Sequence, residues 1–377
     1  MKKEYDYLIV GAGLLGATFA YMARQRGKRC LVIDKRSHLG GNVYCEDVDG
    51  IIVHKYGPHI FHTSDEKVWK FVNGFVPFNQ FTLNPIAVFN GKLYCLPFNM
   101  HTFYQMWGVT KPEDAIAIID RQRRDAGLKN PSCLEEQAIS LVGRDVYETL
   151  IKGYTEKQWG RPCRELPADI IKRLPVRFSF NNNYFNDKYQ GIPEGGYNVL
   201  IDGLLEGVEC RTDCNYIDNR SAFEGIADKT IYTGPIDEFF GYRLGRLEYR
   251  SLRFEQEKLP LANFQGNAIV NYSNTDVPYT RVVEHKWFDV HNATAVKASH
   301  TVITREYPQG FTAMDDPYYP INDDYNNRLY HEYLYLARKE AANIIFAGRL
   351  GAYKYLDMDQ TVAAAMSLER KEHEYRA

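Results

Sequence analysis

The stretch YDYLIVGAGLLGATFAYMARQRGKRCLVIDK, residues 5–35, decides the fold of the first part of this chain. Its apolar run over residues 7–10 predicts a buried strand, and residues 30–33 predict a second one. Between them, residues 17–26 predict a helix that Gly27 ends. Three spaced glycines separate the first strand from the helix. The order of strand, glycine turn, helix and strand predicts a βαβ unit that binds a dinucleotide.

The three glycines and the acid that follows them have separate physical tasks. Gly11 permits the tight turn after the strand, Gly13 lets the backbone approach a pyrophosphate, and Gly16 lets the helix pack on the strand. The first turn of the helix then presents free N–H groups to the phosphates. Asp34 stands 23 residues after Gly11, where a carboxylate binds a ribose hydroxyl.

A second glycine turn favours FAD over NAD as the dinucleotide. The pair Gly40-Gly41 follows soon after the acid, an arrangement that resembles the extended fingerprint of FAD proteins. A plain surface turn is the alternative. The middle of the chain has no second glycine motif of the Rossmann type, and the chain has no redox CxxC pair. Both absences argue against a flavoenzyme that pairs a bound nicotinamide with a redox disulfide.

The last part of the chain supports the FAD interpretation. Residues 343–347 predict a late strand, which the pair Gly348-Arg349 follows, and residues 359–370 predict a helix. FAD folds commonly return a late strand, a glycine and a helix N-terminus to the flavin. Many of them have Gly-Asp where this chain has Gly-Arg, so we expect a guanidinium near the phosphate or the flavin.

The composition indicates a soluble globular protein of more than one domain. The chain has 377 residues, of which 45% are hydrophobic and 25% charged, with a formal net charge of −2. No basic excess argues for nucleic acid, and no apolar run has the length of a membrane span. Seven scattered cysteines indicate free thiols in a reducing, cytoplasmic setting, and we expect no metal site.

We predict an α/β fold with a Rossmann-like FAD-binding domain, a helical insertion domain and an antiparallel β-sheet domain. The FAD-binding domain is predicted to be discontinuous, because strand patterns that end at glycine return late in the chain. The predicted ranges are residues 1–78, 196–244 and 325–377 for the FAD-binding domain, 99–172 for the helical domain, and 79–98, 173–195 and 245–324 for the sheet domain.

Several local signals predict where individual elements begin. Three pairs have the spacing of a capping box, in which a hydroxyl side chain starts a helix. They are Thr63 with Glu66, Thr110 with Glu113, and Ser132 with Glu135, and Pro112 fits a first helical turn. Residues 324–340 predict a long helix that leads into the late strand. The stretch FDVHNATAVKASH, residues 288–300, is predicted to be a surface loop.

Aromatic and basic side chains form two candidate binding groups. Tyr154 and Trp159 lie in GYTEKQWGRP, where their rings could stack on a uracil-type base. Core packing is the alternative, but the polar residues between them favour binding. Arg173 and Arg281 lie in separate predicted sheet segments, and guanidinium groups hold phosphate through paired N–H groups. The two arginines are candidates for holding a diphosphate, with surface salt bridges as the alternative.

Two histidines and an acid are candidates for polar groups at the cofactor. His59 and His62 have a spacing that metal ligands use, but no third ligand is evident. We interpret His62 as a group beside the flavin, with a structural hydrogen bond as the alternative. Tyr355 and Asp357 precede the last predicted helix, where they form a cap or contact the flavin.

Ten segments, in order and over nearly the whole chain, together resemble the bacterial UDP-galactopyranose mutases. They are GAGLLGA, DKRSHLGGN, KYGPHIFHT, LPFNMHTFYQMWG, IKGYTEKQWG, NNNYF, QGIPEGGY, YTGPID, VPYTRVVEHK and AGRLGAYKYLDMDQ. Each segment alone is unspecific, whereas the ensemble is specific. The resemblance implies an isomerase that interconverts UDP-galactopyranose and UDP-galactofuranose by ring contraction.

The resemblance also implies redox-neutral chemistry on reduced FAD. Flavin N5 attacks the anomeric carbon, UDP departs, the sugar ring opens and recloses on another hydroxyl, and UDP returns. We therefore expect FAD in its reduced form, an external reductant that the sequence does not name, and UDP-galactose and UDP-galactofuranose as ligands. We also expect a cytoplasmic homodimer that supplies galactofuranose for a cell-surface polysaccharide such as lipopolysaccharide.

Individual residues receive roles from the same resemblance. Arg173 and Arg281 are implied to hold the diphosphate, and His62 and Asp357 are implied to be further catalytic groups. The residues implied to bind substrate are Tyr154, Thr155, Trp159, Tyr184, Asn271, Tyr319 and Tyr355. Those implied to bind FAD are Gly11, Gly13, Leu15, Gly16, Asp34, Lys35, Gly41, Asn42, His59, Ile60, Arg349, Tyr355, Asp357 and Met358.

Two other classes of protein share parts of this pattern. A flavin-dependent oxidoreductase of the amine-oxidase type has the same glycine fingerprint but needs an apolar substrate tunnel, whereas the arginine, tyrosine and tryptophan set suits a nucleotide-sugar. A non-catalytic FAD-binding protein would have no reason to keep two arginines facing the flavin. The mutase is therefore the preferred interpretation, and turnover that demands oxygen or an electron acceptor would favour the oxidase.

Overall fold

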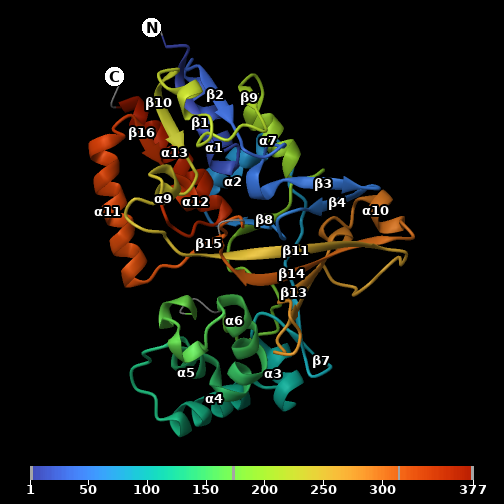
Figure 1. The fold of residues 1–377 in the computed structure, drawn as a ribbon. Coiled ribbons are helices and arrows are strands. Elements are labelled where there is room, and N and C mark those ends of the chain that lie inside the picture. Colours follow the sequence, from blue (N-terminus) through green and yellow to red (C-terminus); the bar gives the residue numbers. More distant parts are fainter. Residues whose placement is uncertain (1–2, 172–174, 313–314, 375–377) are drawn as a thin grey trace.

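The computed structural model describes residues 3–171, 175–312 and 315–374. Its first layer is a parallel sheet of five strands in the order β16-β10-β1-β2-β9 (Figure 1). The strands are β1 (Tyr5–Val10), β2 (Cys30–Ile33), β9 (Glu209–Arg211), β10 (Ala227–Tyr232) and β16 (Ile344–Phe346). Val10 pairs with Ile33 and with Tyr232, so three carboxyl ends meet at one edge. The strands predicted at 7–10, 30–33 and 343–347 are confirmed, with small shifts of their ends.

Helices cover both faces of this parallel sheet. On one face α1 packs against α7 and α13, and on the other Leu329 and Tyr333 of α11 pack with Leu8 and Leu31 of the central strands. The helices are α1 (Leu14–Gln25), α7 (Tyr197–Leu205), α11 (Asp324–Glu340) and α13 (Met358–Glu374). The helices predicted after the glycine turn, at 324–340 and at 359–370 are confirmed.

A second sheet of seven strands crosses the middle of the molecule in Figure 1, in the order β15-β11-β14-β13-β12-β6-β7. Its strands are β6 (Ile86–Phe89), β7 (Lys92–Cys95), β11 (Tyr249–Leu259), β12 (Ile269–Tyr272), β13 (Arg281–Glu284), β14 (Thr301–Gly310) and β15 (Tyr319–Pro320). Neighbouring strands are antiparallel except for β6 and β12, which are parallel. β6 and β7 lie within residues 79–98, one of the ranges predicted for the sheet domain.

The register of the second sheet brings three polar residues into one row. Asn271 of β12 lies opposite Arg281 of β13, and Arg281 lies opposite Glu306 of β14. Residues directly opposite each other on neighbouring strands point to the same face of a sheet. The three side chains therefore emerge together, although they are far apart along the chain.

A group of helices with its own hydrophobic core lies below this sheet in Figure 1. The helices are α3 (Met100–Trp107), α4 (Pro112–Ala126), α5 (Leu134–Val146) and α6 (Lys152–Trp159), with a π-helical turn at Tyr147–Ile151. Phe103, Ile119, Val142 and Tyr147 are buried among them. Pro112 stands in the first turn of α4, as predicted.

The remaining elements connect these layers. Two small sheets pair β3 (Cys45–Val48) with β4 (Ile51–His54), and β5 (Phe61–Thr63) with β8 (Tyr189–Gly191). The other helices are α2 (Glu66–Asn73), α8 (Arg220–Phe223), α9 (Ile236–Phe239), α10 (Ala293–Lys297) and α12 (Gly348–Gly351), with single 3₁₀ turns at Gly41–Val43, Cys163–Glu165, Ala168–Ile171 and His285–Phe288. The ranges predicted for the three domains stay a prediction.

The capping box predicted at Thr63 and Glu66 is wrong. Asp65 caps α2, because its carboxylate accepts hydrogen bonds from the backbone N–H groups of Lys67 at 2.8 Å and Val68 at 3.3 Å. The Thr63 hydroxyl instead donates to Asp359 at the start of α13. An acid two positions after Thr63 satisfied the free N–H groups of the first turn.

The other two predicted capping boxes are also wrong. The residues that precede α4 and α5 are Lys111 and Cys133, and neither makes a side-chain cap. Thr110 and Glu113 therefore form no box, nor do Ser132 and Glu135. The backbone N–H and hydroxyl of Ser132 both donate to Glu136, at 2.7 and 2.8 Å. Ser132 therefore pairs with the carboxylate four residues further on, Glu136, and not with that of Glu135.

Residues 288–300 are more ordered than the predicted surface loop. They contain α10, which Asn292 caps by accepting from the Ala295 N–H at 3.1 Å. Ala295 is buried with Ile51 and Val302. This segment therefore packs against the β3–β4 hairpin.

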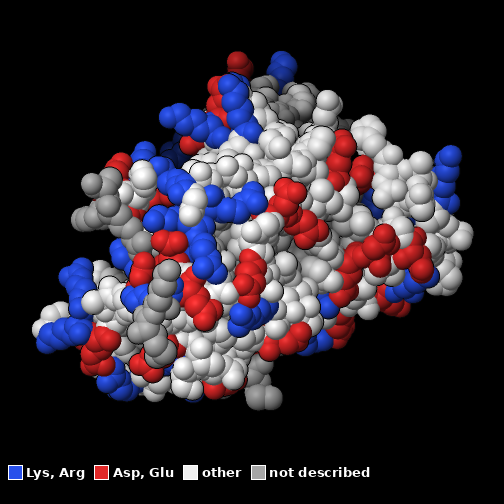
Figure 2. Space-filling view, turned by 90° about the horizontal axis from the view of Figure 1, so that it is seen from above, with Lys and Arg blue, Asp and Glu red and all other residues white. Residues whose placement is uncertain are grey.

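Surface charge and cysteine state agree with the expectations from composition. Lys and Arg are mixed with Asp and Glu over the face that Figure 2 shows, as a net charge of −2 would suggest. All seven cysteines are free thiols. Among the described residues, no helix is long and apolar enough to cross a membrane, and no group of side chains there could hold a metal ion.

Gly16 is packed too closely for any side chain, and a substitution there tests the helix–strand contact. A Cβ at Gly16 would lie 2.0 Å from the carbonyl oxygen of Gly11. Overpacking a core costs about 1–3 kcal/mol, so Gly16→Ala should lower the free energy of unfolding by at least that amount in chemical denaturation. Gly310→Ala is the control, because no atom lies within 4 Å of a Cβ there. Equal loss in both variants would contradict the contact.

Candidate active site

The first cavity opens at the carboxyl edge of the parallel sheet and measures about 340 Å³. It begins beside Val10, at the end of β1, and extends to the late segment that follows β16. Ten residues predicted to bind FAD line it: Gly11, Gly13, Leu15, Asp34, Lys35, Gly41, Asn42, His59, Arg349 and Met358. Residues predicted from opposite ends of the chain are thus brought together in one cavity.

The glycine turns have the geometry of a phosphate cradle. Gly11 has a φ of +106°, and a Cβ there would lie 2.0 Å from the hydroxyl of Thr233. Gly41 has a φ of +55°, and its Cβ would lie 2.9 Å from the Cα of Gly13. The two turns therefore touch through bare backbone, next to the N-terminus of α1. Such a surface of backbone N–H groups suits a pyrophosphate, so the residues present fit a dinucleotide.

Asp34 holds the rim of this cavity in shape. Its carboxylate accepts from the N–H of Ala12 at 2.8 Å and from that of Arg36 at 2.9 Å. Asp34 is 7% exposed and lines the cavity. A carboxylate has about four acceptor positions, so two remain for ribose hydroxyls.

Four residues predicted to bind FAD lie outside the lining of the first cavity. Gly16 lies beneath the turn, against the carbonyl of Gly11. Ile60 is 7% exposed and belongs to the hydrophobic core. Tyr355 and Asp357 flank the cavity, which is lined there by the alternate residues Leu356 and Met358.

A second cavity of about 230 Å³ is lined by residues of α6, of β12 and of other parts of the helical group. It contains five of the residues predicted to bind substrate: Tyr154, Thr155, Trp159, Tyr184 and Asn271. Apolar side chains such as Phe98 and Ile171 form much of its wall. An aromatic and apolar wall with a few polar groups is typical of a site for a planar ring.

Two buried oxygen atoms, on side chains that line the second cavity, have no hydrogen-bond partner among the described residues. They are Oε1 of Gln158 and Oδ1 of Asn271. A buried acceptor without a partner costs about 1–3 kcal/mol. The arrangement therefore favours a ligand that brings N–H or O–H donors to both places.

Arg281 lies within electrostatic range of residues that line each of the two cavities. Its Nε donates to a carboxylate oxygen of Glu306 at 2.9 Å, and Glu306 is only 2% exposed. Burial lowers the pKa of the Arg281 guanidinium, but the charge of Glu306 outweighs burial and raises it, so the group stays cationic. Burial also raises the pKa of Tyr154 and Tyr319, whose hydroxyls stay protonated close to this cation.

The charge of Arg281 also reaches the first cavity. Burial, with the added effects of Arg349 and Arg281, lowers the pKa of His59 to about 4. The ring of His59 is therefore neutral near pH 7. Since His59 lines the first cavity and Tyr154 the second, Arg281 is within electrostatic range of both.

Arg349 adds a second cation on the side of the first cavity. Its guanidinium donates to the carbonyl of Leu356 at 2.9 Å and lies 4.9 Å from the ring centre of Tyr355. The rings of Tyr355 and Tyr319 are 5.9 Å apart. Two tyrosines predicted to bind substrate are thus next to each other and to a cation.

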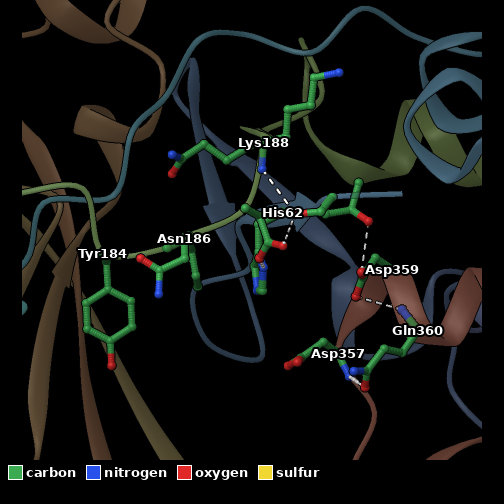
Figure 3. Close-up of polar contacts among 12 residues, drawn as sticks. His62, Tyr184, Asn186, Lys188, Asp357, Asp359 and Gln360 are labelled. Carbon is green, nitrogen blue, oxygen red and sulfur yellow. Dashed lines mark hydrogen bonds and ion pairs between the residues drawn. The ribbon is translucent and has the colours of Figure 1, made fainter. Parts of the chain in front are cut away.

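His62 lies apart from the lining of both cavities, between two segments (Figure 3). On one side is the segment of Tyr184 and Asn186, and on the other the start of α13 with Asp357. Its Nδ1 is 2.7 Å from a carboxylate oxygen of Asp187, and its ring stacks on Phe185 at 3.7 Å. His62 therefore has a fixed orientation.

Sequence reasoning missed several residues at this site. Glu306 and Thr233 were not selected, because nothing in their local pattern marks them, and Gln158 was not selected either. Arg250 was also missed; its Nε donates to the carbonyl of Gln158 at 3.0 Å and ties α6 to β11. Only Gln158 had a local signal, since it stands between the two aromatic residues already chosen. Arg173 lies outside the described residues.

The fold and the first cavity define a Rossmann-like dinucleotide-binding protein. Residues 9–75 match the family model described as NAD(P)-binding Rossmann-like domain. Residues 149–355, which span the second cavity and Arg281, match the model described as UDP-galactopyranose mutase.

Relatives of similar length extend this match to nearly the whole chain. A probable UDP-galactopyranose mutase of Klebsiella pneumoniae is 41% identical over 96% of this chain and 93% of its own length. A dTDP-fucopyranose mutase of Escherichia coli is 39% identical over 95% of this chain and 96% of its own. The chain belongs to the UDP-galactopyranose mutase family.

Solved structures show how widely the fold itself is shared. The crystal structure of a reduced UDP-galactopyranose mutase superposes with a TM-score of 0.77 at 14% identity, covering 98% of this chain and 94% of that one. A putrescine oxidase superposes with a TM-score of 0.55 at 12% identity, covering 98% and 99%. The fold is thus common to a mutase and an amine oxidase, and the site has to separate them.

Proposed function

We propose that this enzyme is an FAD-dependent isomerase that interconverts UDP-galactopyranose and UDP-galactofuranose. One observation carries the proposal: the second cavity has aromatic walls and side chains with unpartnered buried acceptors, and the partly buried Arg281 lies within electrostatic range of Tyr154 in that cavity and of His59 in the dinucleotide cavity. A cation beside an aromatic wall with a few polar groups suits a nucleotide-sugar. An amine oxidase of the same fold would need an apolar route to its flavin.

FAD is the dinucleotide that best fits the first cavity. Two glycine turns rather than one border it, and Arg349 reaches it from the end of the chain. Its proposed contacts are the predicted residues that line the cavity, with Asp34 accepting from the adenosine ribose. In its reduced form FAD supplies a nucleophilic nitrogen, N5, for the anomeric carbon of the sugar. The reductant is external.

Arg281 is proposed to hold the diphosphate, the group that must leave and return. Its charge persists at any working pH, and Glu306 fixes its direction through Nε. The guanidinium has further N–H groups for phosphate oxygens. Holding UDP in place as it separates from the sugar lowers the cost of bond breaking and keeps UDP ready to return. Arg173 is proposed as a second diphosphate contact.

Tyr154, Thr155 and Trp159 are proposed to bind the uridine on one turn of α6. The aromatic rings stack on the base, and Gln158 Oε1 accepts from the imide N–H that uracil carries. Thymine has the same N–H, which fits the existence of a dTDP-sugar relative. Asn271 is proposed to accept from a hydroxyl of the ligand.

The remaining polar groups are proposed to complete the cleft. Tyr184, Tyr319 and Tyr355 contact the diphosphate as neutral donors, since burial raises the pKa of each hydroxyl. His62, held by Asp187, and Asp357 lie on the flavin side. We further propose a cytoplasmic homodimer whose product feeds a cell-surface polysaccharide.

A direct assay tests the proposed function. The purified holoprotein, reduced with dithionite without oxygen, should convert UDP-galactofuranose into UDP-galactopyranose, and the oxidised protein should not. Chromatography of the two nucleotide-sugars measures the conversion, with dTDP-fucopyranose as a competing substrate. Turnover that needs oxygen or an electron acceptor would overturn the proposal, and preference for the dTDP-sugar would correct its substrate.

Arg281→Lys keeps the positive charge but removes the planar guanidinium and its paired N–H donors. We expect turnover to fall on the order of 100-fold, the effect of losing a donor to developing negative charge, while FAD stays bound. Steady-state kinetics and the flavin spectrum measure the two effects. The control is Arg305→Lys, an arginine of the same sheet that pairs with Glu257 at 2.7 Å. A normal rate in Arg281→Lys would remove Arg281 from the diphosphate site.

Trp159→Ala tests the uridine contact. Loss of one stacked ring should weaken UDP binding by about 1–3 kcal/mol, by analogy with stacking of nucleic-acid bases. Titration calorimetry of the oxidised holoprotein with UDP measures this. Trp107→Ala, a half-buried tryptophan of α3 outside the cavity, serves as the control. Unchanged UDP affinity in Trp159→Ala would place the base elsewhere.

A further inference from the structure

Lys157 makes an unusual set of contacts. Its ammonium donates to four backbone carbonyl oxygens, those of Tyr272 at 2.7 Å, Asn274 at 2.8 Å, Val277 at 3.0 Å and Tyr279 at 2.9 Å. An ammonium has three hydrogens, so at least one is shared between two of these oxygens. The four carbonyls converge on a single point, as in sites that take a dehydrated monovalent cation.

Three of these carbonyls belong to the turn between β12 and β13, and the fourth belongs to Tyr272, the last residue of β12. The turn, residues 273–280, connects the strands at the end where Asn271 and Arg281 face each other. The N–H of Tyr272 donates to the carbonyl of Thr280 at 2.8 Å and closes the turn. The shape of the turn therefore decides where the side chains of Asn271 and Arg281 point.

Lys157 belongs to the helix that lines the other side of the second cavity. It lies on α6 between Tyr154 and Trp159. Gly153, one helical turn earlier, packs on the β12–β13 turn, since a Cβ there would lie 2.0 Å from the carbonyl oxygen of Ser273. Burial lowers the pKa of Lys157 to about 8, while Asp276 favours the charged form. The ammonium is thus partly shielded from solvent where α6 contacts the β12–β13 turn.

We propose that Lys157 is a positioning residue that joins the base-binding helix α6 to the β12–β13 turn, so that Asn271 and Arg281 face the same ligand as Tyr154 and Trp159. The proposal rests on the proposed function, because it treats the second cavity as the nucleotide site. Among the described residues, the ammonium of Lys157 donates hydrogen bonds only to backbone carbonyls. It acts by fixing two side chains that lie on either side of the turn it holds.

Lys157→Met keeps the length of the side chain and removes its donors. The four carbonyls lose a charged partner, the turn relaxes, and UDP affinity should fall about tenfold or more, as expected for loss of hydrogen bonds to a charged group. KM for the nucleotide-sugar should rise by a larger factor than kcat falls, with an unchanged flavin spectrum. Calorimetry with UDP and steady-state kinetics of the reduced holoenzyme measure these effects.

Lys286→Met is the matched control. Lys286 is also buried, and its ammonium donates to the carbonyls of Ala262 and Ala298, at 2.6 and 3.2 Å, away from the second cavity. It should lower the melting temperature and leave UDP affinity unchanged. An equal loss of UDP affinity in both variants would reduce the role of Lys157 to general stability and overturn the proposal.

Two further variants of Lys157 test the same role. If Lys157→Met does not fold, Lys157→Arg takes its place, since its planar fork cannot donate to four converging oxygens. Lys157→Ala should regain UDP affinity with propylammonium, which restores the missing atoms, but not with propanol. Unchanged UDP affinity in the folded variants, or rescue by propanol, would overturn the role of Lys157 alone. If the wild-type holoprotein does not bind UDP, the proposed function fails with it.

Discussion

The ion pair between the partly buried Arg281 and the buried Glu306 is the interaction on which the cleft depends. It places a permanent positive charge within electrostatic range of residues in both cavities, and it does so from neighbouring strands of a sheet rather than from a loop. Glu306 is almost fully buried, so loss of the arginine would leave a carboxylate without a partner in the interior. Removing one member of such a pair is far more costly than the net stability that the pair provides. The guanidinium is therefore held in one direction before any ligand arrives, which is what binding a diphosphate requires.

The helical group is attached to this pair through backbone contacts. Gly153 and Lys157 of α6 approach the β12–β13 turn so closely that helix and turn form one unit, and Arg250 ties the end of the same helix to β11. The helix carries the aromatic residues of the second cavity, and the turn separates Asn271 from Arg281. Packing in this region therefore sets the distance between the part of the cleft that suits a base and the part that suits a diphosphate.

The same fold serves different chemistry elsewhere, since a putrescine oxidase superposes over nearly all of this chain. What the two proteins share is the fold. The second cavity carries the distinction, because its unpartnered acceptors and nearby cations are costly to bury unless a polar ligand satisfies them. Membership of the mutase family and the chemistry of this cavity point in the same direction.

The sequence alone was enough to predict features that depend on residues close together in the chain. The glycine turn, the strands beside it, the long helix at 324–340, ten residues of the first cavity and five of the second follow from spacing and residue type, or from resemblance to a family. Three helix caps were misjudged, because an acid two residues further on capped the helix instead or no side chain capped it at all. Only the tertiary structure revealed Glu306, the four carbonyls around Lys157 and the unpartnered oxygen of Gln158. Their roles arise from strand register and from contacts between residues more than a hundred positions apart, and neither register nor long-range packing leaves a periodic trace in the chain.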